Sequence, residues 1–271
     1  MMDEMRKTIQ SFQETKNFTT LNNHEVLIVY DYVKQKKHFN NHPNENFEPI
    51  LKLDPFRVEL VPSRAYQEEL DKKDKLKNID TLYNANYVLE ADLDDFVQSN
   101  EERKEAYQMA KTFIDNFEKN KFIKGLYFHG QNRTGKTFLI SAVANELSKK
   151  GVSIIFAYVP DLVRNIHSGI GDNSVETKVE QLKYCDLLIL DDLGSVKMSL
   201  WFRDQIFGSV IQHRLSIGAP IIITSNLELR QLADFLVDDS VSNDKYNAVR
   251  IITRIEEMTE TVKLSAYRYK K

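Results

Sequence analysis

Residues 130–137 read Gly130-Gln131-Asn132-Arg133-Thr134-Gly135-Lys136-Thr137, which matches the phosphate-loop pattern G-x-x-x-x-G-K-[ST]. The apolar run Leu126–His129 before it predicts a buried strand, and apolar residues in 137–147 recur at helical spacing. The pattern binds phosphate in this order of strand, loop and helix. At average glycine usage, a chance match in a chain of this length has a probability of about 1%.

The loop's chemistry follows from its glycines and from the helix behind it. Gly130 and Gly135 stand where a side chain would collide with a polyphosphate surrounded by backbone N–H groups. The positive N-terminal end of the following helix points at the same oxygens. We therefore expect residues 130–137 to bind the phosphates of ATP, with Lys136 at the β- and γ-phosphates and the Thr137 hydroxyl on Mg²⁺.

A second strand ends in two acids. Leu187-Leu188-Ile189-Leu190 is followed by Asp191 and Asp192, at the carboxyl end where open α/β sheets bind ligands. An apolar run ending in two aspartates is a weak signal alone, but it becomes strong when it follows a phosphate loop with one strand between. We expect Asp191 to hold Mg²⁺ through its water shell and Asp192 to orient or deprotonate the attacking water.

A third strand, Pro220–Ser225, ends next to Asn226. If this strand lies between the other two, Asn226 can hydrogen-bond the γ-phosphate or the lytic water. The alternative is that Asn226 caps a helix that begins near Glu228.

Three arginines near the end of the chain are further candidates. Arg250 and Arg254 are four residues apart on one face of a predicted helix, where surface salt bridges would explain either. An arginine offered to a neighbouring copy's γ-phosphate would instead stabilise transition-state charge, and it would give a reason for assembly into rings or spirals. Arg268 is a candidate for contact with the chain's own nucleotide. The residues alone do not decide between Arg250 and Arg254.

Composition excludes several classes of protein. The net charge of −3 argues against coating duplex DNA by charge alone. No apolar run approaches the roughly 18 residues of a membrane span, and the polar start lacks a signal-peptide core, so we expect a cytoplasmic protein without a membrane partner. Cys185 is the single cysteine, which excludes an intrachain disulfide, and its apolar context favours a structural thiol over a nucleophile.

The chain divides by pattern into two parts. Residues 1–37 suggest two helices, with a strand pair as the alternative, and residues 50–61 suggest a short hairpin or edge strand. The charge run at 68–77 is typical of a solvated helix or connector. We therefore expect a smaller, mostly helical domain over 1–77 and an α/β domain over 78–271.

The second part alternates strands with helical patterns, which predicts a parallel sheet covered by helices. We expect five strands, at Leu126–His129, Val152–Tyr158, Asp186–Asp191, Pro220–Ser225 and Val262–Tyr267.

With these motifs, the chain resembles the DnaI/DnaC-type bacterial replicative-helicase loaders, a branch of the AAA+ ATPases, and looks closest to the DnaI form. The resemblance covers about 78–271 well and the N-terminal part poorly. The stretches that carry it are 124–130 leading into the phosphate loop, Leu188–Gly194, Trp201–Gly208, Thr224–Asn226 and Val249–Ile255.

The resemblance implies roles for single residues. Lys136 and Thr137 would be Walker A residues, and Asp191 and Asp192 Walker B residues. Asn226 would be sensor I.

It also implies that Arg250 is an arginine finger acting in trans and Arg268 the sensor II arginine. The segment Val159–Tyr184 would be an insertion that faces single-stranded DNA inside a helical assembly. Its basic or potentially basic groups are Arg164, His167, Lys178 and Lys183.

The chain departs from this family in its N-terminal part. DnaI-type loaders commonly carry a zinc-binding N-terminal domain, but no cysteine precedes Cys185, and His38 and His42 lie in a stretch that favours a linker. We therefore expect no zinc, and expect contact with a DnaB-type replicative helicase through apolar helix faces such as Val26, Tyr30 and Val33. The 45 residues after Asn226 (227–271) are too few for a final strand plus a full lid domain.

Three functions stay open at this point. The first is an ATP-dependent loader that places the replicative helicase on single-stranded DNA and self-associates with nucleotide. The second is a transposition helper ATPase of the IstB type. The third is a nucleotide-gated adaptor with negligible hydrolysis, because Asp192 stands where vigorous AAA+ ATPases carry glutamate.

Overall fold

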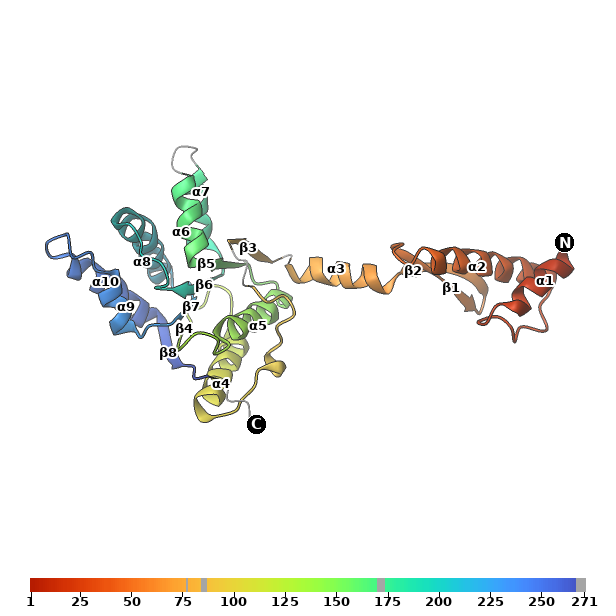
Figure 1. Ribbon diagram of the computed structural model, residues 1–271, viewed down its shortest axis with the longest axis horizontal. Coiled ribbons are helices and arrows are strands. Elements are labelled where there is room, and N and C mark those ends of the chain that lie inside the picture. Colours follow the sequence, from red (N-terminus) through yellow and green to blue (C-terminus); the bar gives the residue numbers. More distant parts are fainter. Residues whose placement is uncertain (77, 84–86, 170–173, 267–271) are drawn as a thin grey trace. The chain divides into compact units, whose positions relative to one another are not determined.

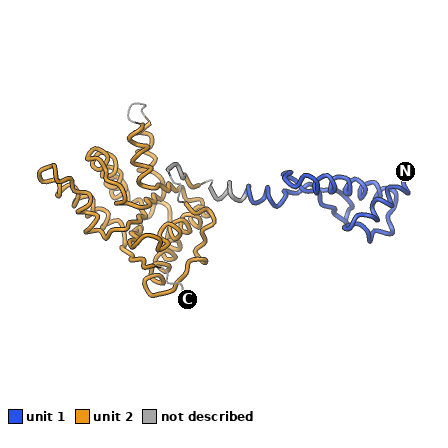
Figure 2. The backbone as a smooth tube through the Cα atoms, in the orientation of Figure 1, with its two compact units in different colours: residues 1–74 blue, residues 75–271 orange. Residues whose placement is uncertain are grey.

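The computed structural model describes residues 1–76, 78–83, 87–169 and 174–266. The chain forms two compact units, residues 1–74 and 75–271 (Figure 2). The division falls within the charge-rich helix α3 (Arg64–Leu76). None of the helices described is both long and apolar enough to cross a bilayer.

The first unit packs two helices on a β-hairpin. Its elements are α1 (Met2–Ser11), α2 (Asn23–Asn41), β1 (Phe47–Leu53) and β2 (Phe56–Pro62). The hairpin expected near residues 50–61 is present as the antiparallel pair of β1 and β2. Asn22 begins α2 with a capping box, accepting from the backbone N–H of Glu25 while the Glu25 carboxylate accepts from the Asn22 N–H.

The apolar face of α2 forms the core of this unit rather than a docking surface. Val26 and Val33 are both 0% exposed, and Val26 packs in a cluster with Ile9. The expectation that these valines bind a partner is therefore wrong, because α1 and the hairpin cover the face that the helical spacing marked as apolar.

The end of α2 brings three exposed side chains together. The helix continues to Asn41, and the chain then turns so that the Glu45 carboxylate lies 2.9 Å from His38 Nε2. Ligand atoms of His38, His42 and Glu45 all lie within 4.8 Å of one another. The stretch read as a linker is thus a folded turn on α2.

The second unit is built on a parallel sheet of six strands in the order β3-β5-β6-β7-β4-β8 (Figure 1). The strands are β3 (Ile79–Tyr83), β4 (Gly125–His129), β5 (Ile154–Tyr158), β6 (Leu187–Leu193), β7 (Ile221–Ser225) and β8 (Thr259–Lys263).

The sheet differs from expectation at both edges. It has six strands rather than five, because β3 reads Ile-Asp-Thr-Leu-Tyr, which is neither the continuous apolar run of the central strands nor a strict alternation. The last strand covers Thr259–Lys263 rather than Val262–Tyr267, because α10 (Asp244–Met258) passes into β8 without a glycine or proline to mark the boundary. Tyr267, the last residue of the expected strand, lies outside the described part.

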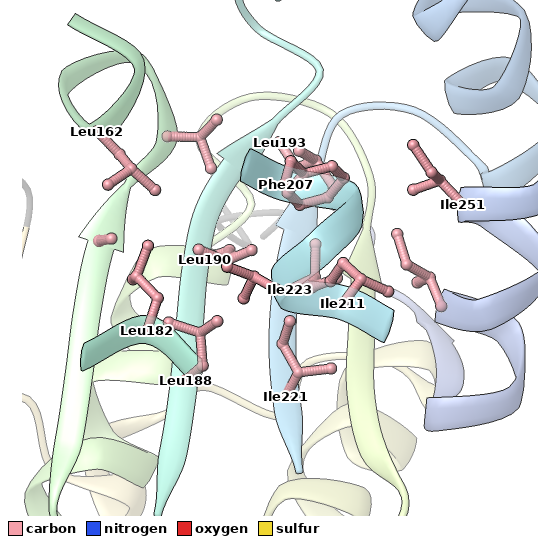
Figure 3. Close-up of a cluster of buried hydrophobic side chains, with 14 of the residues drawn as sticks. Leu162, Leu182, Leu188, Leu190, Leu193, Phe207, Ile211, Ile221, Ile223 and Ile251 are labelled. Atoms are coloured by element: carbon pink, nitrogen blue, oxygen red, sulfur yellow. The ribbon is translucent and has the colours of Figure 1, made fainter. Parts of the chain in front are cut away.

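Helices cover both faces of the sheet, as the pattern predicted. On β6, Leu188 and Leu190 belong to one buried cluster, and Leu187 and Ile189 belong to the other, because successive side chains of a strand point to opposite faces. Figure 3 shows part of the first cluster, where Leu190 lies beside Ile223, its pairing partner on β7.

The first cluster packs against α6 (Val159–Ser168), α7 (Ser174–Tyr184), α8 (Gly208–Ile217), α9 (Leu229–Leu236) and α10. The second packs against α4 (Glu101–Asn116), α5 (Lys136–Lys149) and the short 3₁₀ helix Leu93–Asp95. After Asn226, the described residues form α9, α10 and β8, with no separate helical lid among them.

Candidate nucleotide site

The site lies where the central strands β4, β6 and β7 end. β7 pairs with β6 on one side and with β4 on the other. The strand ending near Asn226 therefore lies between the phosphate-loop strand and the acidic strand, which was the condition for Asn226 to reach the nucleotide. Parallel strands present their carboxyl ends at the same edge, so the three polar segments meet there.

The phosphate loop takes the backbone conformation that its glycines permit. Gly130 has φ +151° and Gly135 has φ +94°. A Cβ atom on Gly130 would lie 2.1 Å from the carbonyl oxygen of Leu264, so no larger residue fits there. Gly135 is the N-cap of α5, whose first residue is Lys136.

Lys136 reaches across the loop from the first turn of α5. Its Nζ donates to the carbonyl oxygens of Gly130 (2.8 Å) and Gln131 (3.0 Å) and to Oδ1 of Asn226 (2.8 Å). The side chain is buried, and burial lowers the pKa of the Lys136 ammonium, with Asp192 and Asp191 opposing that shift. Among the described residues Lys136 forms no salt bridge, so its charge remains available to a phosphate.

Asp191 and Thr137 bring a carboxylate and a hydroxyl together at the edge of the cavity. The Thr137 hydroxyl lies 3.2 and 3.1 Å from the two carboxylate oxygens of Asp191, and the Thr224 hydroxyl donates to Oδ1 at 2.6 Å. Asp191 is 2% exposed, and burial raises the pKa of its carboxyl. A divalent cation would offset this penalty, and a hydroxyl next to a carboxylate supplies the hard oxygens that Mg²⁺ prefers. The residues present therefore fit the metal.

Asp192 sits on a distorted part of β6. Its φ is +63°, and the pairing with β7 shifts register between Leu190 and Leu193. Side chains of β7 replace the lost ladder bonds: the Asp192 N–H donates to the Thr224 hydroxyl (2.8 Å), and the Ser225 hydroxyl donates to the Leu193 carbonyl (2.5 Å). Such bulges re-aim a side chain beside active sites.

Thr224 is therefore a site residue to which the sequence analysis gave no role. One hydroxyl accepts from the Asp192 amide and donates to the Asp191 carboxylate, so it fixes both acids. The signal was present, since Thr224 and Ser225 are the polar end of a strand that otherwise reads Ile-Ile-Ile.

Asn226 connects the lysine to the second acid. Its Oδ1 accepts from Lys136, and its Nδ2 donates to Oδ1 of Asp192 at 3.2 Å. The alternative role as a helix cap is not what the structure shows, because Glu228 is the N-cap of α9 and forms a capping box with Gln231.

An open cavity of about 250 Å³ lies between these groups. Its lining comprises Asn132, Arg133, Thr134, Gly135, Lys136, Thr137, Tyr158, Asp191, Asp192, Thr224 and Asn226. Within it, the buried Thr134 Oγ1 has no hydrogen-bond partner among the described residues. Buried hydroxyls are normally bonded, so a ligand oxygen fits here. Tyr158, at the end of β5, was not predicted as a lining residue.

Of the three candidate arginines, the two that the structure describes do not line this cavity. Arg250 is exposed on α10 and does not line the cavity of its own chain. Arg254 is partly buried, and burial together with the nearby Arg250 lowers its pKa. Arg268 lies outside the described residues.

The segment Val159–Tyr184 forms two helices, α6 and α7. Residues 170–173, between the two helices, lie outside the described part of the chain. Arg164 pairs with Asp161, and Lys183 pairs with Glu180, each pair one helical turn apart.

Arg133 carries backbone strain that glycine would relieve. Its φ is +62°, a conformation that costs most residues about 1–2 kcal/mol and glycine almost nothing. We predict that Arg133→Gly raises the free energy of unfolding by about 0.5–1 kcal/mol, measured by urea denaturation without nucleotide. Arg133→Ala is the control, because it removes the same side chain beyond Cβ but keeps the strain. An equal gain in both variants would show that strain is not the cause.

Comparison with known proteins places this chain in a family. A family model described as IstB-like ATP binding protein matches residues 63–271. The replicative helicase loader DnaI of Bacillus subtilis (strain 168) is 26% identical over 284 residues, covering 97% of this chain and 91% of that protein. The replicative helicase loader DnaC of Escherichia coli (strain K12) is 26% identical over 133 residues, covering 48% of this chain and 53% of that protein.

Solved structures agree with the sequence comparison. A crystal structure of DnaI has a TM-score of 0.64 at 34% identity and covers 69% of this chain and 98% of that one. A crystal structure of the DnaC helicase loader has a TM-score of 0.55 at 26% identity and covers 64% of this chain and 96% of that one. The resemblance and the AAA+ fold class inferred from the motifs are thus confirmed. The chain belongs to the IstB-like ATP binding protein family, in the group that contains the DnaI and DnaC helicase loaders.

Proposed function

We propose that this protein is an ATP-dependent loader that binds the replicative helicase and places it on single-stranded DNA. The observation that carries the proposal is the hydrogen-bonded chain Lys136–Asn226–Asp192 beside the Thr137–Asp191 pair, in a chain that aligns along 97% of its length with the loader DnaI. That arrangement supplies groups for binding ATP and for hydrolysing it.

Each residue has a distinct part in hydrolysis. Thr137 and Asp191 would hold Mg²⁺, which neutralises charge on the β- and γ-phosphates when it is bound. Lys136 stabilises the negative charge of the transferring phosphoryl group. Asp192 accepts the proton of the attacking water, and Asn226 holds the Asp192 carboxylate in place through its Nδ2.

We assign self-association to the outer face of α10. Tyr246 is 78% exposed and Val249 is 42% exposed, and both lie next to the exposed Arg250 on that helix. An aromatic, an aliphatic and an arginine side chain together are typical of the centre of a protein interface. We propose that this face packs on a second copy and brings Arg250 to its γ-phosphate.

Single-stranded DNA is assigned to the α6–α7 segment. The pairs Arg164–Asp161 and Lys183–Glu180 are exposed or partly exposed, and such pairs contribute only about 0–1 kcal/mol. Phosphates can therefore replace the acids as partners at little cost. Binding through so few cations would be weak in one copy and would gain strength when several copies line one strand.

Helicase contact is assigned to the first unit, residues 1–74. With the valines of α2 buried, three of the five large apolar side chains that are exposed in the described part of this unit lie on the hairpin, where Phe47 is 46%, Leu53 53% and Leu60 62% exposed. The other two are Met1 and Leu27, and Leu27 stands alone on α2 at 44% exposure. We propose that the hairpin, rather than α2, meets the helicase.

The test is size-exclusion chromatography with light scattering on the full chain and the replicative helicase of the same organism. We expect a complex with the wild-type chain, loss of that complex in Phe47→Asp with Leu60→Asp, and its retention in the control Lys52→Glu on the same hairpin. Without helicase, ATP should raise the mass of the wild type, and Arg250→Ala should stay at the mass seen without ATP. Absence of a helicase complex with and without ATP would sink the loader function.

A transposition helper is the second candidate, and it is favoured by the family model described as IstB-like, which covers residues 63–271. Both functions use the same ATP site, so the partner separates them. A complex with a transposase and none with the helicase in the same column experiment would favour the helper.

A further inference from the structure

The phosphate loop must keep its carbonyl groups turned away from the phosphates, and buried carbonyls need a donor on the outer side. Thr134, in the middle of the loop, is 2% exposed, so water is not at hand to satisfy its backbone. The donor comes from another element. Nη1 of Arg103, on the first turn of α4, lies 2.5 Å from the Thr134 carbonyl oxygen.

Arg103 is fixed on all sides. The residue is 4% exposed, its Nε donates to the Val97 carbonyl at 2.6 Å, and its guanidinium carbon lies 4.4 Å from the centre of the Phe96 ring. A planar fork with five donors can hold carbonyls of separate segments in one geometry, which a lysine ammonium cannot do. The guanidinium also lies against the loop's second glycine, since a Cβ on Gly135 would be 3.6 Å from Nη2.

The same guanidinium reaches the segment that follows β8. Nη1 also donates to the Ser265 carbonyl at 3.2 Å, and Asn100 Nδ2 donates to the Ser265 hydroxyl at 2.9 Å. The Leu264 N–H donates to the His129 carbonyl at 2.7 Å, directly before the loop. Residues 264–265 are therefore bonded to α4 and to the chain at the start of the phosphate loop.

We propose that Arg103 is a positioning residue of the nucleotide site: it holds the phosphate loop in its binding shape and transmits nucleotide occupancy to residues 264–265. The loop carbonyl and the Ser265 carbonyl share one donor nitrogen, so a phosphate that draws the loop inward changes how firmly the segment is held. Arg103 contacts no nucleotide in this scheme, and it acts through the backbone of Thr134.

The experiment compares the full wild-type chain with Arg103→Met, Arg103→Lys and the control Lys104→Met. Lys104 follows Arg103 on α4 but is exposed and pairs with Glu101. Isothermal titration with ATP and Mg²⁺ gives the Kd. Displacements of about 1 Å in such sites cost on the order of 100-fold, so we expect Arg103→Met to raise the Kd by roughly 10- to 100-fold. The Kd of Arg103→Lys should lie between those of the wild type and Arg103→Met, and the Kd of Lys104→Met should stay within about twofold of the wild type.

Hydrogen exchange supplies the readout that a merely structural residue would not move. In the wild type, ATP should change the exchange of amides in residues 259–266, and in Arg103→Met at saturating ATP that response should be absent. Arg103→Lys serves as the folded variant if the methionine variant does not fold. An unchanged Kd in both Arg103 variants would overturn the positioning role. If ATP changed the hydrogen exchange of residues 259–266 in Arg103→Met as much as in the wild type, the proposed link between the nucleotide and residues 264–265 would be overturned. The role of Arg103 rests on the ATP binding of the proposed function and does not require a helicase complex. Absence of that complex would therefore leave the Arg103 result unaffected.

Discussion

Asp192→Asn is expected to lower the rate of ATP hydrolysis by about 10²- to 10⁴-fold, the range supplied by a positioned general base. Asparagine has the shape of aspartate but does not accept a proton from water at neutral pH. It also tolerates the left-handed backbone at φ +63°, so the bulge in β6 should survive the change. Its Oδ1 can still accept from Asn226 Nδ2, which keeps the hydrogen bond to that residue.

A measurement of ATP binding shows whether the lower hydrolysis rate of Asp192→Asn comes from the lost base or from a damaged site. Asp192 is not assigned to the metal, so the variant should bind ATP with Mg²⁺ within a few-fold of the wild type. Asp191→Asn is the matched comparison on the neighbouring residue. It removes the carboxylate next to Thr137 and should weaken binding that depends on Mg²⁺. Steady-state phosphate release and titration with ATP measure the two properties.

The same measurement decides whether the protein is a motor or an adaptor. Turnover in the wild type that disappears in Asp192→Asn supports hydrolysis with Asp192 as base. Equal turnover in both proteins would remove Asp192 from the mechanism. A wild type that binds ATP but releases no phosphate, with helicase and single-stranded DNA present, would favour the nucleotide-gated adaptor.

Sequence was sufficient for the parts of the site that local chemistry defines. The loop at 130–137 and the two acids near the end of β6 could be predicted because each depends on residue type at fixed spacing. The position of Asn226 could be predicted only conditionally, because it requires β7 to lie between β4 and β6. That order depends on how strands far apart in the chain pair, and the structure supplies it.

Sequence was insufficient where one side chain serves two distant segments. Arg103 precedes Thr134 by 31 residues and Ser265 by 162, and nothing around it in the chain marks it as more than a charge on an amphipathic helix. The apolar spacing on α2 was equally ambiguous, since Val26 and Val33 have the same pattern whether the face is covered by the hairpin or by a partner. The edge strand β3 was not predicted because Asp80 and Thr81 interrupt its apolar residues, whereas the predicted strands of the same length are apolar runs.

Asp244→Asn is expected to be the most destabilising single change in the ATPase unit among those considered. Asp244 begins α10, and its two carboxylate oxygens accept from Nη1 and Nη2 of Arg203 at 2.5 and 2.6 Å. Arg203 and Asp244 are 1% and 2% exposed. A buried charge that loses its only partner costs about 3–5 kcal/mol. Arg203 keeps a second partner, because its Nε and Nη2 also donate to the Asp204 carboxylate at 2.7 and 2.8 Å, so we expect a smaller cost of about 2–3 kcal/mol. Urea unfolding at pH 7 measures this loss of stability. The control is Asp239→Asn at an exposed position, whose free energy of unfolding should stay within about 0.5 kcal/mol of the wild type.

The Arg203–Asp244 pair also predicts how the stability lost in Asp244→Asn depends on pH. The Arg203 guanidinium lowers the pKa of the Asp244 carboxyl from 3.8 to about 2. A lowered pKa means that the stabilisation is fully present above the unfolded-state pKa and is lost as pH falls through the folded-state pKa. The difference in free energy of unfolding between wild type and Asp244→Asn should therefore be constant from pH 7 to about 5 and narrow below about 4. A difference under 1 kcal/mol at pH 7 would contradict the prediction.

Asp244→Asn should disturb the outer face of α10, to which we assign self-association, more than it disturbs the nucleotide cavity. α10 carries Tyr246, Val249 and Arg250 within two turns of Asp244, whereas Lys136 and Asp191 are held by α5 and the sheet. A loosened first turn disorders side chains that must meet a second copy, but leaves the phosphate loop bonded as before. At a temperature where Asp244→Asn is still folded, we expect ATP binding within a few-fold of the wild type together with loss of the ATP-dependent increase in mass. If Asp244→Asn lost ATP binding together with the ATP-dependent increase in mass, α10 and the nucleotide site would unfold as one unit.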